Sequence, residues 1–140
     1  MIKIAVIGAG SLGFTRKITT DLLSVPELRD RVDLRFTDIS KRNLDMVTRL
    51  VRRDMEANGV KSTLSATTNR REALEGCRYA FCTVRVGGLE AYQTDIEIPL
   101  KYGIDQCVGA TLCAGGITYA QRSIPALLDF CQDISEVSAP

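Results

Sequence analysis

The sequence predicts an α/β fold of the Rossmann type, with a doubly wound parallel sheet. Short apolar segments alternate with amphipathic helical patterns along the 140 residues, which is the order expected of consecutive β-α-β units. The first apolar segment runs directly into Gly8-Ala9-Gly10-Ser11-Leu12-Gly13, and a helical pattern follows. A G-x-G-x-x-G turn between a strand and a helix is typical of folds that bind dinucleotides.

The expected elements follow one another with short connections. Strands are predicted where apolar residues are bounded by turn residues, and helices where apolar residues recur every three or four positions. The strands cover residues 2–7, 32–37, 63–67 and 78–84, and the helices cover residues 12–24, 41–58, 69–76, 90–102 and 116–137. Residues 104–114 are expected to be irregular or to contain one short strand.

Local signals set the boundaries of the first two helices. Val25 precedes Pro26 and therefore ends the first helix, because a residue before proline avoids the helical region. Ser40 is a suitable N-cap for the second helix, and Gly59 ends it as a left-handed residue. The apolar face of this helix is formed by Leu44, Val47, Val51 and Met55.

The second half of the chain follows the same logic. Asn69 begins a short helix that Gly76 ends, and Gly87-Gly88 closes the fourth strand. Gly103 ends the fourth helix, and the last helix begins near Gly116. In the usual strand order the fourth strand lies beside the first, so the two glycine turns should face each other. At least one further strand is expected after this segment, so the predicted sheet is incomplete at its C-terminal end.

The first glycine turn predicts a binding site for a dinucleotide. Gly8 is expected to form the tight turn, and Gly10 to let the backbone approach a pyrophosphate. Gly13 is expected to let the helix pack closely on the strand. The phosphates would then lie at the helix N-terminus, where free N–H groups and the positive end of the helix dipole attract anions.

Asp38 stands at the end of the second strand, where a carboxylate can accept hydrogen bonds from the adenosine ribose. The same charge repels a 2′-phosphate, so NAD is predicted rather than NADP. Lys41 and Arg42 could screen such a phosphate, or they could form a solvated first helical turn.

Three further groups of residues deserve an interpretation. The turn Arg85-Val86-Gly87-Gly88-Leu89-Glu90 is expected to approach the nicotinamide half of the cofactor, or else to be a flexible loop. Gly115-Gly116 offers another, less specific set of N–H groups before a helix. Asp95 and Glu97 point to different faces of one helix, so at most one of them can reach a shared site.

Composition excludes several classes of function. The net charge of +1 argues against nucleic-acid binding, and no apolar run is long enough for a membrane span. The chain has no histidine, which removes histidine metal ligands and general bases. Its five cysteines are interpreted as free thiols in a reducing cytosol, so a cytoplasmic location is expected. Cys107 and Cys113 are interpreted as small buried residues rather than nucleophiles, because no histidine can activate them.

A set of motifs along the chain closely resembles the N-terminal part of the family 4 glycoside hydrolases. The resemblance covers essentially the whole chain, and the stretch from the second glycine turn to Gly103 is its most specific part. The motifs are Gly8-Ala9-Gly10-Ser11, Asp38, residues 71–76, Val86-Gly87-Gly88, Asp95, residues 98–103 and residues 122–125.

The resemblance implies an NAD-dependent glycosidase that acts on a small-molecule α-glycoside. In this mechanism the 3-hydroxyl of the sugar is transiently oxidised, and a divalent metal, usually manganese, polarises the resulting ketone. Elimination of the aglycone, addition of water and re-reduction then regenerate the cofactor. Cofactor contacts are expected from Gly8, Ala9, Gly10, Ser11, Leu12, Gly13, Asp38, Val84, Arg85 and Gly87.

Tyr92 bears on the substrate. Phosphoglycosidases of this family carry an arginine at this position, where a guanidinium fork suits a phosphate group. A tyrosine there favours the members that act on unphosphorylated α-glycosides, namely α-galactosidases, α-glucosidases and α-galacturonidases. Among these, α-galactosidase is preferred.

The chain departs from the family pattern at Ala110, which replaces an acidic residue thought to strengthen the catalytic base. The metal ligands and the base itself are expected downstream of Pro140, so residues 1–140 are expected to hold no catalytic or metal-binding residue. We therefore expect one NAD-binding domain that is a fragment of a longer, homo-oligomeric enzyme. A sugar or hydroxyacid dehydrogenase and a free-standing NAD-sensing module are the alternatives.

Overall fold

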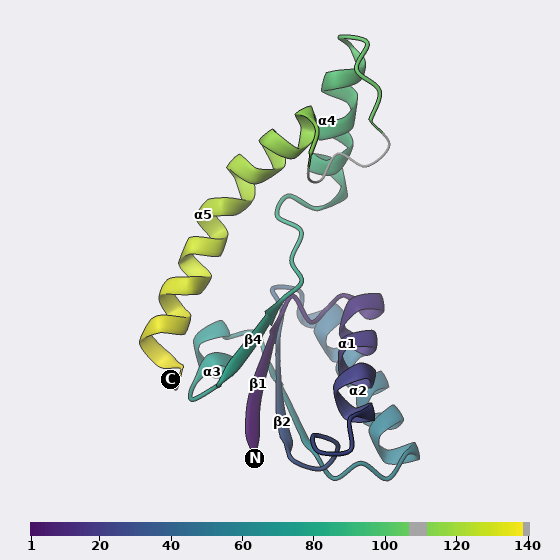
Figure 1. Ribbon diagram of the computed structural model, residues 1–140, viewed down its shortest axis with the longest axis vertical. Helices are drawn as coiled ribbons and strands as arrows, with labels where there is room; N and C mark the ends of the chain where they lie inside the picture. Colours follow the sequence, from purple (N-terminus) through teal and green to yellow (C-terminus); the bar gives the residue numbers. More distant parts are fainter. Residues whose placement is uncertain (107–111, 139–140) are drawn as a thin grey trace. The chain divides into compact units, whose positions relative to one another are not determined.

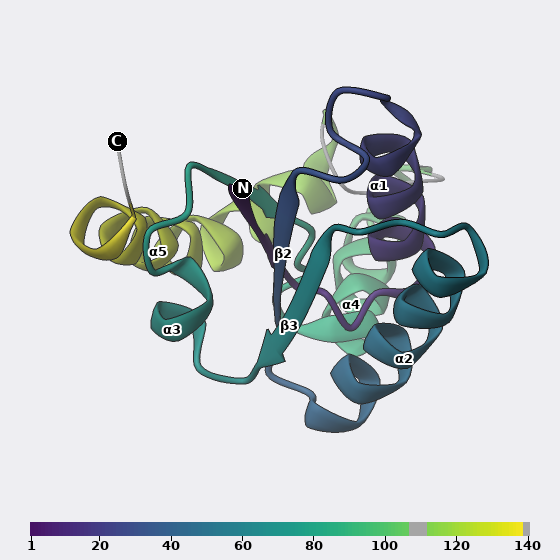
Figure 2. The same ribbon diagram turned by 90° about the horizontal axis from the view of Figure 1, so that it is seen from below.

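The computed structural model describes residues 1–106 and 112–138, which form two compact units. The first unit contains residues 1–84 and 133–138, and the second contains residues 85–106 and 112–132. The elements, labelled in Figure 1 except for β3, which is labelled in Figure 2, are β1 (Ile2–Ile7), α1 (Leu12–Ser24), β2 (Val32–Thr37), α2 (Lys41–Ala57), β3 (Thr63–Thr67), α3 (Arg70–Leu74), β4 (Tyr79–Cys82), α4 (Gly88–Leu100) and α5 (Ala114–Val137).

The first unit is built on a parallel sheet with the strand order β3-β2-β1-β4. Helices α1 and α2 cover one face of this sheet, and α3 lies against the other, as Figure 2 shows from below. The position of β4 beside β1 confirms the predicted order, with Ile4 paired to Leu34 on one side and Tyr79 on the other. The α/β fold class is therefore confirmed.

The core of the first unit lies between the sheet and the helices α1 and α2. All four residues of the predicted apolar face of α2 are buried, which confirms the helical pattern. Full burial of one such side chain contributes about 1.5–3 kcal/mol, so this face fixes α2 on the sheet. The core residues include Ile4, Val6, Leu23, Val32, Leu34, Phe36, Leu44, Val47, Val51 and Met55.

The predicted boundaries are within two residues of the observed ones, and α4 differs most, by two residues at each end. Strand β4 spans Tyr79–Cys82 rather than residues 78–84, because its pairing with β1 extends over Ile4–Ile7. Helix α4 begins at Gly88 rather than Glu90, since the left-handed Gly87 serves as its N-cap. Helix α5 begins at Ala114 rather than Gly116.

Strand β4 forms one edge of the sheet, and all four of its residues are exposed. A further strand beside it remains a prediction. Residues 104–106 have no regular structure, in agreement with the sequence, and residues 107–111 lie outside the described part. No helix within residues 1–106 and 112–138 is long and apolar enough to cross a membrane.

Candidate functional site

The first glycine of the turn is required by its backbone conformation. Gly8 has a φ of +85°, and a Cβ atom there would lie 2.7 Å from the carbonyl oxygen of Thr83. The N–H groups of Gly8 and Ala9 both donate to the carbonyl of Thr37, at 2.9 and 3.0 Å. The predicted tight turn at Gly8 is confirmed, and the turn is attached to the ends of both neighbouring strands.

Gly10 leaves room for Asp38. A Cβ atom at Gly10 would lie 2.8 Å from both Cγ and Oδ2 of Asp38. The Gly10 N–H donates to Asp38 Oδ2 at 2.8 Å, and the Ser40 N–H donates to Oδ1 at 2.7 Å. Each carboxylate oxygen keeps further acceptor capacity for a ligand hydroxyl. Gly10 and Asp38 are 28 residues apart in the sequence, so no local sequence pattern predicts the hydrogen bond between them.

The role expected of Gly13 is wrong. We expected this glycine to let α1 pack closely on the strand, but it is exposed, and a Cβ atom there would meet nothing within 4 Å. The buried residues of α1 are Thr15, Thr19 and Leu23. Gly13 lies on the other side of the first helical turn, so it cannot shorten the distance between helix and sheet.

The N-terminus of α1 is not capped by a side chain. Ser11 occupies the N-cap position without a side-chain hydrogen bond, and the first turn contains no acidic residue. At the start of α2, by contrast, Ser40 accepts a hydrogen bond from the Asn43 N–H. The first turn of α1 thus presents backbone N–H groups and the positive end of a helix dipole without an internal anion.

The end of β4 lies beside the glycine turn. The Thr83 hydroxyl is within hydrogen-bond distance of the carbonyls of Ile7 and Gly8, at 3.3 and 3.2 Å. Val84 Cγ1 would be 3.0 Å from a Cβ atom at Gly8. The first unit therefore brings Gly8, Gly10, Asp38 and Val84 together, whereas Arg85 and Gly87 belong to the second unit.

In the second unit, Arg85 is held by aromatic rings. Its guanidinium lies 4.5 Å from the ring centroid of Tyr92 and 6.0 Å from that of Tyr119. These distances are within the range of cation–π attraction. Gly87 and Gly88 both have left-handed backbones, with φ of +89° and +66°. Glycine is the residue that adopts such conformations without a steric cost, which explains both glycines of the turn.

The two acidic residues on α4 have different surroundings. Asp95 is buried, and hydrogen bonds first from Arg122 and then from Thr118 hold the pKa of its carboxyl below the ordinary value, against the effect of burial. Glu97 is exposed and is bonded to Gln93. Asp95 is thus the anionic half of an ion pair and not a free acid or base.

Cys77 and Cys131 are free thiols, in agreement with the interpretation from the sequence. Burial raises the pKa of the Cys77 thiol, which keeps it protonated and poorly nucleophilic. Cys107 and Ala110 lie outside the described residues. Within residues 1–106 and 112–138, no group of three His, Cys, Asp or Glu side chains could hold a metal ion.

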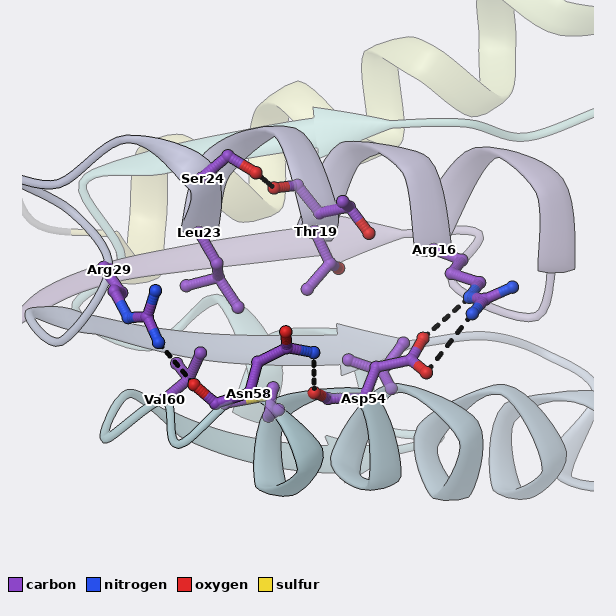
Figure 3. A pocket seen from close by; sticks show the side chains of 11 residues that line it. Arg16, Thr19, Leu23, Ser24, Arg29, Asp54, Asn58 and Val60 are labelled. Atoms are coloured by element: carbon purple, nitrogen blue, oxygen red, sulfur yellow. Dashed lines mark hydrogen bonds and ion pairs between the residues drawn. The ribbon is translucent and has the colours of Figure 1, made fainter.

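A cavity of about 160 Å³ lies apart from this site, between α1 and α2 (Figure 3). Arg16 and Asp54 form an ion pair at 2.7 Å along its rim, and Arg29 donates to the carbonyl of Asn58. Leu23, Val51, Met55 and Val60 provide its apolar lining. No residue of the glycine turn lines this cavity, so it is distinct from the candidate dinucleotide site.

Comparison with known proteins identifies the family. The sequence pattern of the family 4 glycosyl hydrolases matches residues 3–140. The chain belongs to this family. It is 62% identical to an α-galactosidase of Rhizobium meliloti over 138 residues, which are 99% of this chain and 28% of that protein. It is 30% identical to an α-galacturonidase of Thermoanaerobacterium saccharolyticum, over 96% of this chain and 29% of that protein.

A solved structure of the family has the same fold. The 6-phospho-β-glucosidase of Thermotoga maritima, solved with manganese, NAD+ and glucose-6-phosphate, superimposes with a TM-score of 0.86 at 28% identity. The match covers 99% of this chain and 32% of that protein. The chain therefore spans about a third or less of the length of these relatives. The family resemblance and the Rossmann-type fold are both confirmed.

The contacts of Arg122 in the second unit could not be predicted from the sequence. The sequence marks Arg122 only as part of a family motif, but its side chain donates hydrogen bonds to Asp95 and to the Val86 carbonyl of the second glycine turn. In the sequence, Arg122 is a single arginine in the middle of a long predicted helix. Such an arginine can be a solvated surface residue or the partner of a buried carboxylate. Only the burial of Asp95 distinguishes the two interpretations.

Proposed function

We propose that this chain is the NAD-binding part of a glycosidase that hydrolyses unphosphorylated α-glycosides, preferably α-galactosides. The observation that carries the proposal is the closure of the Gly8–Gly13 turn on Asp38 beside an uncapped helix N-terminus. This arrangement offers an anion site and a ribose-binding carboxylate in one place. The 62% identity to an α-galactosidase supports the choice of substrate.

The residues present fit NAD. The N–H groups at the start of α1 would hold the pyrophosphate, and the open side of Gly13 leaves space for its approach. Asp38 would accept hydrogen bonds from the ribose hydroxyls. Ala9, Ser11, Leu12, Val84, Arg85 and Gly87 complete the proposed set of cofactor contacts. When bound, NAD would supply a hydride acceptor that is regenerated in each turnover.

The surroundings of Asp38 support NAD over NADP. Lys41, which could have screened a 2′-phosphate, forms an ion pair with Asp45 at 2.9 Å on the exposed surface of α2. This contact favours the interpretation of Lys41 as part of a solvated helical turn. With Lys41 paired in this way, the Asp38 carboxylate would repel a 2′-phosphate.

The environment of Tyr92 supports an unphosphorylated sugar. Its ring is stacked against the Arg85 guanidinium at 4.5 Å. A phosphate-binding fork at position 92 would place a second positive charge against Arg85, whereas a tyrosine ring stabilises that charge. We therefore propose that Tyr92 lies near the sugar and contributes no phosphate site.

We propose that the manganese ligands lie in another part of the enzyme. A relative was solved with manganese, and we propose the same requirement for the whole enzyme. As the family resemblance implies, we propose that the metal ligands and the catalytic base lie outside residues 1–140. We propose residues 1–140 as one NAD-binding domain of a cytoplasmic enzyme.

Cofactor binding is tested by isothermal titration calorimetry with NAD and the Asp38→Ala variant. The variant should bind NAD about tenfold more weakly, because the ribose loses a charged hydrogen-bond acceptor. Asp54→Ala, which removes a carboxylate paired with Arg16 at the separate cavity between α1 and α2, is the matched control and should leave the affinity unchanged. Unchanged affinity in Asp38→Ala would refute the role of Asp38.

Activity is tested on the whole enzyme with manganese, NAD and three substrates: an α-galactoside, an α-glucoside and an α-galacturonide. We expect hydrolysis of the α-galactoside with no net accumulation of NADH. Accumulation of NADH in proportion to product would indicate a dehydrogenase instead. Binding of NAD without turnover of any of the three sugars would favour an NAD-sensing module.

A further inference from the structure

Arg122, on α5, connects the second glycine turn to a buried carboxylate on α4. Its Nη2 and Nη1 atoms donate to Oδ2 and Oδ1 of Asp95 at 2.6 and 3.3 Å, and its Nε donates to the carbonyl of Val86 at 2.9 Å. Asp95 is 3% exposed and also accepts a hydrogen bond from the Thr118 hydroxyl at 2.6 Å. All four residues belong to the second unit.

The turn is built around this guanidinium. Gly87 has a φ of +89°, and a Cβ atom there would lie 2.5 Å from Ala91 Cβ and 2.8 Å from Arg122 Nε. The Gly88 N–H donates to the carbonyl of Arg85 at 3.3 Å. The turn is thus fixed by hydrogen bonds inside the second unit and leaves no space for a side chain at position 87.

The two edges of the Arg122 guanidinium have separate partners. One edge forms the paired contact with Asp95, and the Nε edge reaches the turn. The planar fork of arginine allows both contacts at once, whereas the single ammonium of lysine cannot reproduce them. Asp95 fixes the plane of the guanidinium and therefore the direction of the bond to Val86.

We infer that Arg122 is a positioning residue that holds the Val86–Gly88 turn in the shape that receives the nicotinamide half of NAD. This inference rests on the proposed function, because it requires that NAD binds. A turn that is already ordered loses less conformational entropy when a ligand arrives, which increases affinity without a direct contact. Arg122 acts through Val86 and Gly87 and does not itself touch the ligand.

The test compares NAD with ADP-ribose, which has the same adenosine and pyrophosphate groups but no nicotinamide. In the unaltered protein NAD should bind more tightly than ADP-ribose. In Arg122→Lys the affinity for NAD should fall by about tenfold, because a charged hydrogen bond to the turn is lost. The affinity for ADP-ribose should change by less than about twofold, since the adenosine site lies in independent contacts.

Arg71→Lys is the matched control. Arg71, on α3, pairs with the buried carboxylate of Asp133 at 2.6 Å, so the same substitution disturbs a similar ion pair that belongs to the first unit. Its ratio of NAD to ADP-ribose affinity should equal that of the unaltered protein. If Arg122→Lys does not fold, Thr118→Val removes one hydrogen bond from Asp95 and should shift the ratio in the same direction by a smaller amount.

The outcomes separate the two proposals. A parallel fall in affinity for both ligands, or an unchanged ratio in Arg122→Lys and Thr118→Val, would overturn the positioning role. Equal binding of NAD and ADP-ribose by the unaltered protein would also overturn it, while leaving the adenosine site intact. Failure of the unaltered protein to bind either ligand would overturn the proposed cofactor site itself.

Discussion

The three glycines of the first turn satisfy different physical requirements, although they belong to one motif. Gly8 has a left-handed backbone and a neighbouring carbonyl that excludes a side chain. Gly10 leaves room for the Asp38 carboxylate, and Gly13 faces open space. Adding the same methyl group should therefore have different consequences at each position.

Gly8→Ala should lower the free energy of unfolding by about 2–4 kcal/mol, because it combines an unfavourable φ with a steric clash. Gly13→Ala should raise it by up to about 1 kcal/mol, since alanine is the better helix former. Urea denaturation of both variants measures these changes. Calorimetry should find weaker NAD binding by Gly13→Ala, as expected if the pyrophosphate approaches this open side.

Equal destabilisation by the two substitutions would contradict this distinction. Gly59→Ala provides a reference for backbone strain alone. Gly59 is left-handed, with a φ of +64°, and a Cβ atom there meets nothing within 4 Å. Its effect should therefore lie between those of Gly8→Ala and Gly13→Ala.

At the scale of elements, α1 and α2 begin in different ways. Ser40 caps α2 with its side chain, whereas Ser11 leaves the first turn of α1 without such a bond. Both serines are suitable N-caps by sequence. The difference follows from the tight glycine turn, in which the Ser11 N–H donates to Gly8 and the next N–H groups stay free of side-chain partners.

Ser40→Ala should therefore lower the free energy of unfolding by about 1 kcal/mol through loss of the cap. Ser11→Ala should change it by less than about 0.5 kcal/mol, because no cap is lost. Urea denaturation followed by circular dichroism compares the two variants directly. A loss at Ser11 as large as that at Ser40 would mean that Ser11 also caps its helix.

The elements were predictable where their signals are local. Helix α1 and strands β2 and β3 have the predicted bounds, since turn residues and a proline mark their ends. The extent of β4 was not predictable, because it depends on how far β1 runs alongside it. The start of α4 was missed because glycines are normally placed outside helices, whereas Gly88 lies within this one.

At the scale of the whole molecule, both units contain a buried aspartate that pairs with arginine. Asp133 in the first unit lies on α5, and Asp95 in the second unit pairs with an arginine of α5. In the first unit Asp133 accepts hydrogen bonds from Arg70 and Arg71, both at 2.6 Å. In the second unit Asp95 is bound by Arg122 and Thr118. The partners of Asp133 are 62 and 63 residues away in sequence, so composition could not predict these centres.

These two centres should make stability depend on pH in the acid range. Hydrogen bonds from Arg70, and then from Arg71, lower the pKa of Asp133 from its ordinary value of 3.8. A carboxyl whose pKa is lower in the folded state stabilises the protein above the unfolded pKa, and this contribution is lost as the pH falls through the folded pKa. The loss should therefore occur below about pH 4.

Asp133→Asn should lower the free energy of unfolding at neutral pH by about 1–3 kcal/mol, because two guanidinium groups lose a charged acceptor. The difference from the unaltered protein should shrink as the pH falls below about 4. Urea denaturation at a series of pH values measures it. Asp45→Asn, at an exposed ion pair, serves as the control, and a pH-independent difference for Asp133→Asn would contradict the expectation.

The candidate site was predictable in its parts but not in its connections. The glycine turn and Asp38 each have a sequence signal, whereas the hydrogen bond between Gly10 and Asp38 requires the parallel pairing of β1 with β2. The close-packing role of Gly13 was wrong because a motif does not specify which side of the helix faces the sheet. Arg122 was missed because its partners lie on other elements.

The position of Asp38 constrains how cofactor preference can evolve in this protein. The carboxylate that would select NAD also accepts hydrogen bonds from the backbone at Gly10 and Ser40. A replacement that admits a 2′-phosphate by removing this charge also removes at least one of these two backbone contacts, because even asparagine keeps only one acceptor oxygen. A lineage that acquires NADP specificity should therefore first add a positive charge nearby and retain Asp38. The cofactor preference would then change before the backbone contacts of Asp38 are lost.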